Sequence, residues 1–227
     1  MPDGRAKARQ ALYVPLRITA WLQTPVVSDA LLPIDAVLYY AAHRELYGER
    51  IASHPGALIP SEHREQALVP LAICEGHTPT WYYAASSAQW PTETVEGTDH
   101  WTCRFDAGLS DLIDLPHGRI NTASGRYRGY HMPVFYRSAL SVWWYVRGNR
   151  ETITRLLRLV SHLGKKTSQG WGAVLRWQVE PIEQDWSVTG PSGECMRPIP
   201  ASDGDMLAGY RPPYWVPSRQ TICRMPR

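Results

Sequence analysis

The stretch LGKKTSQGWGAV, residues 163–174, combines three glycines with two lysines. Glycine lets backbone approach another group closely, and clustered amide and ammonium groups are typical of anion sites. The candidate donors in this stretch are the side chains or amides of Lys165, Lys166, Ser168, Gln169, Gly170 and Gly172. The stretch therefore predicts a site for the phosphate groups of a ligand.

The spacing excludes a nucleotide-binding P-loop. A Walker A motif would need Gly where Leu159 stands, and Lys where Trp171 follows Gly170. A helix is also expected before this loop instead of after it, so the loop would lie at the negative end of the helix dipole. An alternative without a ligand stays open, in which Gly164 ends that helix, the lysines interact with its dipole, and Gly170 and Gly172 allow close strand packing.

Charge is distributed unevenly along the chain. Residues 93–116 hold one arginine and six acidic residues, whereas residues 117–180 hold eleven basic and two acidic residues. Within the basic segment, charged and aromatic side chains are interleaved at Arg126, Tyr127, Arg128, Tyr130 and Arg137. This pattern is typical of single-stranded RNA recognition, since guanidinium groups hold phosphates and rings stack on unpaired bases. The alternative is an Arg-rich hairpin with a solvated face.

The elements that must position these residues follow from the hydrophobic pattern. Residues 12–23 alternate apolar and polar side chains, as a half-buried strand does. Residues 33–48 have apolar positions at helical spacing, with Pro33 at the start and Gly48 at the end. Further strands are expected at 68–75, 80–88, 133–147 and 173–180.

A second helix is expected from Asn149, a good N-cap, to Gly164. The order strand, helix, two strands, helix, strand predicts an α+β fold with a ferredoxin-like (RRM-like) βαββαβ core. This core would occupy residues 1–180 and contain a thumb-like insertion at about 89–132, where Gly, Thr, Asp and His are common and periodicity is poor. Residues 181–227 would add a C-terminal β-hairpin and tail.

Composition limits the class of protein. The apolar fraction of 44% and the ten tryptophans exclude a disordered chain. Cys74, Cys103, Cys195 and Cys223 show neither CxxC nor zinc-site spacing, so we expect buried free thiols and no metal or other cofactor. The sequence lacks a signal-peptide pattern and any run of 18 apolar residues, so we expect a cytoplasmic protein without membrane contact.

The glycine-rich stretch resembles the glycine-rich loop of the CRISPR RAMP superfamily. That pattern is a hydrophobic residue, Gly, five residues, then Gly, a hydrophobic residue and Gly, placed between the last helix and last strand of a ferredoxin-like unit. It is matched here by Leu163, Gly164, Gly170, Trp171 and Gly172. The fullest form has another Gly two residues before the first, where this chain has His162. Residues 124–149 and 209–215 extend the resemblance to the small Cas family five-like subunit of type IV effector complexes.

The resemblance implies a non-catalytic subunit that caps the 5′ handle of CRISPR guide RNA. Trp171 joins the implied RNA-binding residues because it lies within the loop. The implied partners are the guide RNA, the backbone RAMP subunit and the large subunit, with target DNA near the protospacer-adjacent motif as a further contact. The acidic first part of the insertion would repel phosphates, so it would meet a protein neighbour or pack locally.

A metal-independent endoribonuclease is the first alternative. RAMP relatives that cut CRISPR transcripts share the glycine loop and use general acids and bases beside it. His43, which we expect on the polar side of the first helix, is the best candidate acid or base, and His131 and His162 are others.

A protein-interaction module without RNA contact is the second alternative. The stretch GYRPPYW, residues 209–215, would then be docking surface, with Arg211 and Tyr214 facing a partner. The same stretch is also typical of a rigid turn whose rings pack on the core.

Overall fold

The computed structural model describes residues 13–48, 65–66, 68–76, 80–106, 121–124 and 127–226. The α-helices are α2 (Ile34–Tyr47) and α4 (Arg150–Leu157), and short 3₁₀ turns are η5 (Thr167–Gln169) and η6 (Pro217–Arg219). The strands are β1 (Val14–Leu22), β2 (Ile73–Glu75), β3 (Trp81–Tyr83), β4 (Val95–Cys103), β5 (Tyr130–Ser138), β6 (Ser141–Gly148), β7 (Val174–Pro181), β8 (Ile199–Pro200), β9 (Met206–Gly209) and β10 (Gln220–Arg224).

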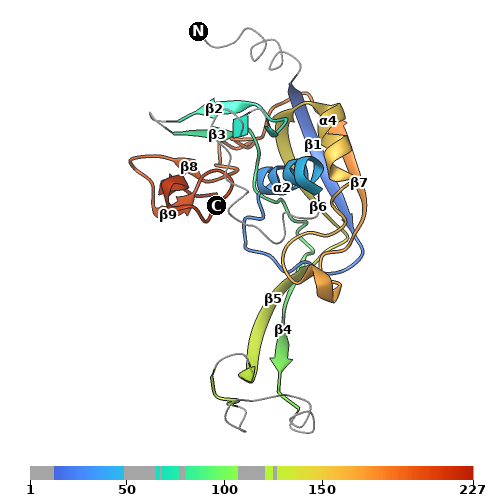
Figure 1. The fold of residues 1–227 in the computed structure, drawn as a ribbon. Coiled ribbons are helices and arrows are strands. Elements are labelled where there is room, and N and C mark those ends of the chain that lie inside the picture. Colours follow the sequence, from blue (N-terminus) through green and yellow to red (C-terminus); the bar gives the residue numbers. More distant parts are fainter. Residues whose placement is uncertain are drawn as a thin grey trace.

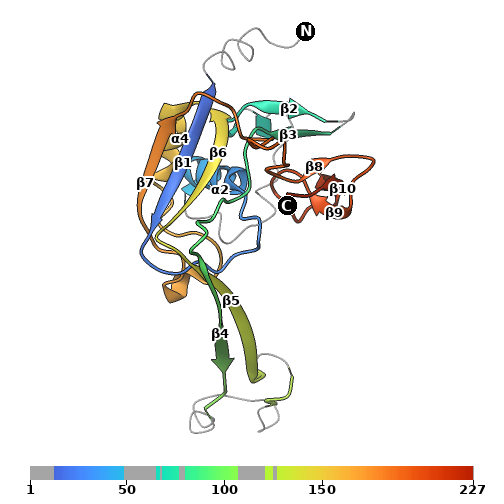
Figure 2. The same ribbon diagram turned by 180° about the vertical axis from the view of Figure 1, so that it is seen from behind.

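The main sheet has the order β6-β1-β7, with both pairs antiparallel. The alternation in β1 confirms the strand predicted at 12–23, because Leu16, Ile18 and Ala20 are fully buried. Helices α2 and α4 cover one face of this sheet, as Figures 1 and 2 show from opposite sides. The core lies between this face and the helices.

Residues within 71–76 and 80–89 continue the sheet beyond β6 through single antiparallel bridges. These bridges join Leu71 to Gly148, Ala85 to Val146 and Gln89 to Trp143. Strands β2 and β3 pair only with each other. The α+β class is confirmed. The ferredoxin-like core stays a prediction, because such a core has a sheet of four strands, and in the described residues the place beside β6 is taken by isolated bridges instead of a continuous strand.

Helix α2 begins after Pro33 and ends at Gly48, which has a φ of 66°, as predicted. Helix α4 also begins as predicted, with the Asn149 side chain accepting a hydrogen bond from the Thr152 amide at 2.9 Å. The predicted end of α4 at Gly164 is wrong, because the helix ends at Leu157.

The early end of α4 has a clear cause. Residues 161–163 are extended and pair with the start of β7. The Leu163 amide donates to the Gly172 carbonyl at 2.8 Å, and the Val174 amide donates to the Ser161 carbonyl at 2.9 Å. Val160 lies in the turn directly after α4 and Leu163 lies in the extended segment, and both are buried. Their spacing therefore matches that of a helix although no helix continues there.

A long antiparallel hairpin, β4 and β5, projects from the core (Figure 1). The hairpin begins inside the insertion predicted at 89–132 and extends past its predicted end, because β5 ends at Ser138. The strand predicted at 133–147 is therefore two strands, β5 and β6, that belong to different sheets. Leu140, predicted on the apolar face, lies at the break and is 80% exposed.

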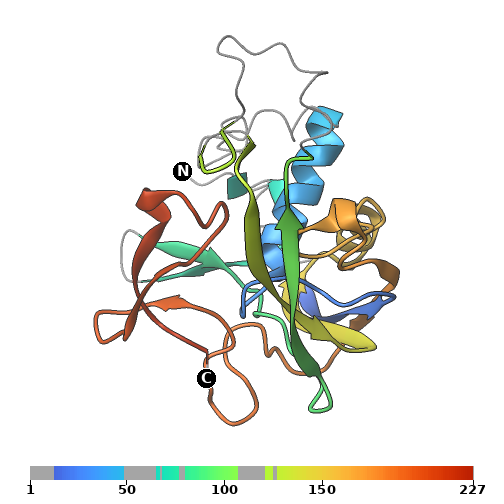
Figure 3. The ribbon, with the colours of Figure 1, turned by 90° about the horizontal axis from the view of Figure 1, so that it is seen from below.

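The C-terminal strands form a separate sheet, β8-β10-β9, which Figure 3 shows to one side of the hairpin. Buried polar contacts tie this sheet to helix α2. Arg197 Nη1 lies 3.2 Å from Asp35 Oδ2, and the Tyr214 hydroxyl donates to Asp35 Oδ1 at 2.7 Å. A second buried ion pair joins Arg219 to Glu65. The C-terminal residues are thus held to the core by buried charges.

The four cysteines are free thiols, as predicted, but their burial differs. Cys223 is buried, whereas Cys103 is exposed on the hairpin, so the prediction of burial is wrong for Cys103. Among the described residues, no helix combines the length and apolar character needed to span a bilayer.

Candidate nucleic-acid interface

The glycine-rich loop turns sharply because four of its residues have left-handed backbone. Positive φ values occur at Gly164 (78°), Lys166 (61°), Gly170 (87°) and Gly172 (72°). Between Lys166 and Gly170 lies the 3₁₀ turn η5, which holds Ser168 and Gln169 exposed at the surface. The loop therefore presents a compact polar turn to solvent.

Two of the glycines serve close packing inside the protein. A Cβ on Gly164 would lie 2.2 Å from the Val27 carbonyl oxygen, and one on Gly172 would lie 1.9 Å from the Leu163 carbonyl oxygen. A Cβ on Gly170 would meet nothing within 4 Å. The close approach expected for a ligand at Gly172 is thus an approach of the chain to itself.

The amides predicted as phosphate donors at the two later glycines are used internally. The Gly170 amide donates to the Thr167 carbonyl at 3.0 Å, and the Gly172 amide donates to the Pro25 carbonyl at 2.7 Å. These two amides are not free to bind phosphate, so the prediction that they do so is wrong. The ammonium groups and the side chains of η5 remain as the donors of the loop.

Both loop lysines have partners that a phosphate can replace or supplement. Lys165 Nζ lies 2.8 Å from Asp29 Oδ1, in a pair whose side chains are 62% and 79% exposed. Exposed pairs of this kind contribute only about 0–1 kcal/mol. Lys166 Nζ lies 2.8 Å from the ring centroid of Trp101 in β4. The lysines therefore link the loop to residue 29 and to the hairpin.

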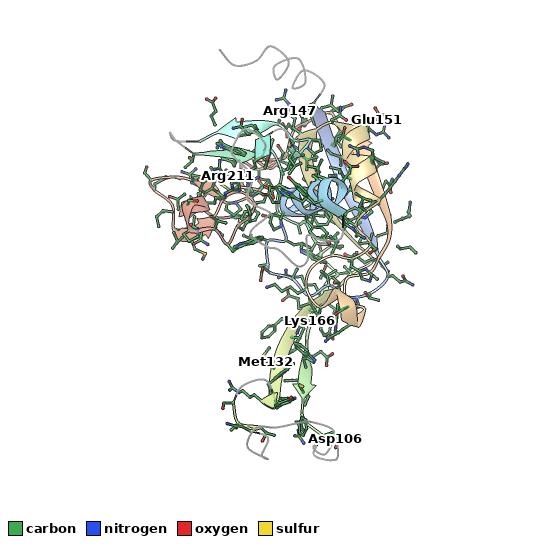
Figure 4. The ribbon with its side chains drawn as sticks, viewed as in Figure 1. Asp106, Met132, Arg147, Glu151, Lys166 and Arg211 are labelled. Carbon is green, nitrogen blue, oxygen red and sulfur yellow. The ribbon has the colours of Figure 1, made fainter. Side chains whose placement is uncertain are left out.

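The loop packs on one face of the hairpin. Trp171 and Tyr136 have ring centroids 5.3 Å apart, and Trp101 lies on the same face as Tyr136 by strand alternation. A groove of about 580 Å³ lies between the loop and this hairpin base. Figure 4 shows Lys166 where the hairpin leaves the core, with Met132 farther along it and Asp106 at its far end.

The predicted group of arginines and tyrosines is spread along the hairpin and is not gathered at one place. Arg126 lies outside the described residues. Tyr127 packs edge-on against Phe105 at 5.3 Å, and Arg128 is exposed. These residues belong to the far part of the hairpin, away from its base.

Two members of that group lie on strand β5 of the hairpin, Tyr130 at its start and Arg137 near its end at the core. Tyr130 packs edge-on against Trp101 at 5.1 Å, so it shares a ring with Lys166. Arg137 donates from Nε to Glu96 Oε1 at 2.8 Å, and its side chain is 25% exposed. Tyr130 therefore extends the loop surface, whereas Arg137 is largely engaged within the protein.

The candidate catalytic histidine does not lie on a polar surface. His43 is 1% exposed, its Nδ1 lies 2.9 Å from the Tyr39 carbonyl oxygen, and burial lowers the pKa of its imidazole. The predicted position of His43 is wrong. His131 is exposed on the hairpin and stacks on His100 at 4.5 Å, and His162 lies beside Ser161 at 3.0 Å.

The stretch at 209–215 is mainly a structural link. Arg211 is 6% exposed and lies 4.0 Å above the Trp81 ring, and the Tyr214 hydroxyl is bound to Asp35. Arg211 and Tyr214 therefore do not face a partner, contrary to that alternative. Trp215 is 61% exposed.

The sequence analysis did not identify Thr24, which follows β1 and hydrogen-bonds to the glycine-rich loop. The Thr24 hydroxyl donates to the Gly170 carbonyl at 2.7 Å and accepts from the Ala173 amide at 2.8 Å. Thr24 and Gly170 are 146 residues apart, and no local pattern connects them. Trp101 was missed for the same reason.

The chain matches the family model of the CRISPR type IV associated protein Csf3 over residues 14–226. The chain belongs to the Csf3 family. This confirms the resemblance to type IV CRISPR-associated proteins, and no match is found among curated proteins.

Among solved structures, this Csf3 family member is similar to a chain described as "Cryo-EM structure of the Type III-B Cmr-beta bound to cognate target RNA". The TM-score is 0.38 and the identity 12%, over 78% of this chain and 64% of the other. The Csf3 family member thus spans just under two thirds of that chain's length.

Proposed function

We propose that this Csf3 family member binds and caps the 5′ handle of a CRISPR guide RNA, as a non-catalytic subunit of a type IV effector ribonucleoprotein complex. The observation that carries the proposal is the exposed turn of the glycine-rich loop, which holds the ammonium group of Lys166 over Trp101 of the hairpin and that of Lys165 in an exposed pair with Asp29. Membership of a CRISPR type IV family supports it.

The lysines act as phosphate ligands in this proposal. Lys165 exchanges its exposed partner Asp29 for a phosphate, because the exposed pair is worth little in water. Lys166 keeps its contact with Trp101, and the remaining N–H groups of its ammonium donate to phosphates of the RNA backbone. Ser168 and Gln169, exposed in η5, add neutral hydrogen bonds.

The aromatic side chains hold unpaired bases. Trp171 and Tyr136 line the groove beside the loop, and Tyr127, Tyr130 and Arg128 continue along the hairpin. Base stacking on such rings contributes about 1–3 kcal/mol per base. Most of the affinity for RNA then comes from the attraction between the lysines and the phosphates. The groove determines which nucleotides of the RNA lie against the rings.

The architecture is consistent with a RAMP subunit. The order β7-β1-β6, with helices on one face, supports a ferredoxin-like core in residues 1–180, with residues within 71–76 and 80–89 at its fourth strand. The hairpin corresponds to the thumb. On its strand β4, the exposed Glu96 lies on the face opposite the groove and suits contact with a protein neighbour such as the backbone or large subunit, near the protospacer-adjacent part of target DNA.

The RNA that copurifies with the expressed effector complex tests this proposal. Sequencing is expected to show guide RNA with a constant repeat-derived 5′ end, protected by this subunit. Deletion of the subunit should leave that end open to 5′ exonuclease. Recovery of the same protected end without the subunit would contradict capping.

The endoribonuclease alternative is tested separately. Purified protein is incubated with repeat RNA in EDTA, and no cleavage is expected because the best candidate, His43, is buried. Cleavage of the RNA in EDTA would overturn the non-catalytic role. Loss of that cleavage in His43→Ala, His131→Ala or His162→Ala would then identify the histidine responsible.

A further inference from the structure

The face of the main sheet that points away from the helices carries its own set of side chains. In β1, Leu16, Ile18 and Ala20 are fully buried toward the helices, so Arg17, Thr19 and Trp21 point to the opposite face. Figure 2 shows strands β7, β1 and β6 in front of helices α2 and α4. We call the side chains of Arg17, Trp21, Trp143 and Arg176 on this side the open face.

The open face holds two arginine–tryptophan stacks. The Arg17 guanidinium lies 4.9 Å from the ring centroid of Trp143, and the Arg176 guanidinium lies 4.6 Å from that of Trp21. A guanidinium stacked on an indole is planar and cationic, and nucleic-acid bases stack on guanidinium planes as well as on rings. The pairs thus offer flat surfaces together with charge for phosphates.

Two donors on the open face lack acceptors within the described part of the chain. Trp143 Nε1 and Arg17 Nε are both shielded from solvent. Trp21 Nε1, in contrast, donates to Gln178 Oε1 at 3.1 Å. A buried donor without an acceptor is costly, and native proteins rarely keep one without a reason. Because a ligand cannot reach atoms that the protein shields, these two donors take no part in binding, and the reachable surface comes from the exposed Arg176 and the partly buried Arg17, Trp21 and Trp143.

The open face is continuous with the glycine-rich loop. Strand β1 ends at Leu22, and directly after it the Gln23 amide donates to the Ala173 carbonyl at 2.8 Å. Trp21 is paired with Arg176 in the register of β1 and β7. The Trp21–Arg176 stack therefore lies at the end of the sheet next to the loop, and the Arg17–Trp143 stack lies farther along the strands.

We propose that the open face is a second nucleic-acid site, on which unpaired bases of a single strand stack against the two arginine–tryptophan pairs. This second site goes beyond the proposed function. It rests on that function only in one respect, namely that the RNA strand bound at the glycine-rich loop continues onto the open face. The acidic Glu180 on this face accepts a hydrogen bond from Gln178 Nε2 at 2.8 Å and is exposed to solvent, which screens its repulsion of phosphates.

The test measures binding of fluorescein-labelled, unstructured oligo(U) RNA and oligo(dT) DNA to the full chain by anisotropy. The Arg17→Ala/Arg176→Ala variant is expected to bind single strands about tenfold more weakly. Duplex RNA, whose bases are not free to stack, should lose much less affinity. Equal losses for RNA and DNA would indicate base stacking, and a loss for one alone would identify the strand that the face recognises. The matched control is Arg158→Ala/Arg150→Ala, which removes the same charge from the first residue and the C-cap of α4, and it should change binding by less than about twofold.

Each outcome separates this inference from the proposed function. Loss of binding in Lys165→Ala/Lys166→Ala but not in Arg17→Ala/Arg176→Ala overturns the open-face site and leaves the loop assignment standing. The reverse result supports the open-face site against the loop.

A crosslinking measurement on the unaltered protein guards against a misfolded variant. Ultraviolet irradiation of the oligo(U) complex, followed by peptide mass spectrometry, is expected to yield adducts on peptides that contain Trp21 or Trp143. Adducts confined to the hairpin and loop would overturn the inference. So would a variant that loses assembly with neighbouring subunits while it binds both oligonucleotides normally, because the face would then be a protein interface.

Discussion

Substituting Gly172 by alanine tests whether the glycine-rich loop is built around the protein's own backbone. Gly172 has a φ of 72°, where an L-residue pays about 1–2 kcal/mol. The added Cβ would lie 1.9 Å from the Leu163 carbonyl oxygen, so the backbone has to move. That movement breaks hydrogen bonds that join Gly172 to Leu163 and to Pro25, at about 0.5–1.5 kcal/mol each. The total loss of unfolding free energy is about 2–5 kcal/mol.

Gly170→Ala is the matched control. Its φ of 87° carries the same conformational cost of about 1–2 kcal/mol, but its Cβ would meet nothing within 4 Å. Urea denaturation followed by tryptophan fluorescence gives both free energies, and unchanged m-values show that the native states stay comparable. Equal losses at the two positions would refute the reasoning, since only Gly172 is closely packed. Gly170→Ala should also keep most of its RNA affinity, because the two lysines stay in place.

The other predictions concern buried charge, pH and the hairpin. Asp35→Ala leaves the buried Arg197 guanidinium without its carboxylate, so chemical denaturation should show a loss of about 3–5 kcal/mol, and a loss under about 1 kcal/mol would contradict the role of this pair. Burial lowers the pKa of His43 below 6.5, so the unfolded state takes up its proton first, and stability should fall as pH drops through about 6.5. A His43→Gln variant should flatten this dependence, and an unchanged profile would show that other groups cause it. Trp101→Ala removes the ring under Lys166, so hydrogen exchange measured by mass spectrometry should speed up in β4 and β5 around residue 101 and stay unchanged in β1.

Elements with a single dominant pattern could be predicted from the sequence. Strand β1 shows strict alternation because one of its faces is buried. Helix α2 lies between Pro33 and Gly48, and α4 begins at a side-chain cap on Asn149. In each case the signal and the structure it describes are local.

The remaining features depend on contacts that are distant in sequence. Val160 and Leu163 keep helical spacing although no helix continues there, because tertiary pairing of residues 161–163 with β7 outweighs local preference. The buried pair of Arg197 and Asp35 joins residues 162 apart. The loop could be predicted as a cationic turn, but its contacts with Thr24 and Trp101 could not, since those residues come from other elements.

The salt dependence of guide RNA binding tests the central claim most directly. Each phosphate contact by a lysine contributes about −0.7 to the slope of log affinity against log salt for a single strand. Wild-type protein and the Lys165→Ala/Lys166→Ala variant are titrated with the same 5′-handle RNA over a range of salt concentrations. We expect the variant to bind more weakly, with a slope shallower by up to about 1.4. An unchanged affinity and slope would show that the glycine-rich loop does not hold the RNA.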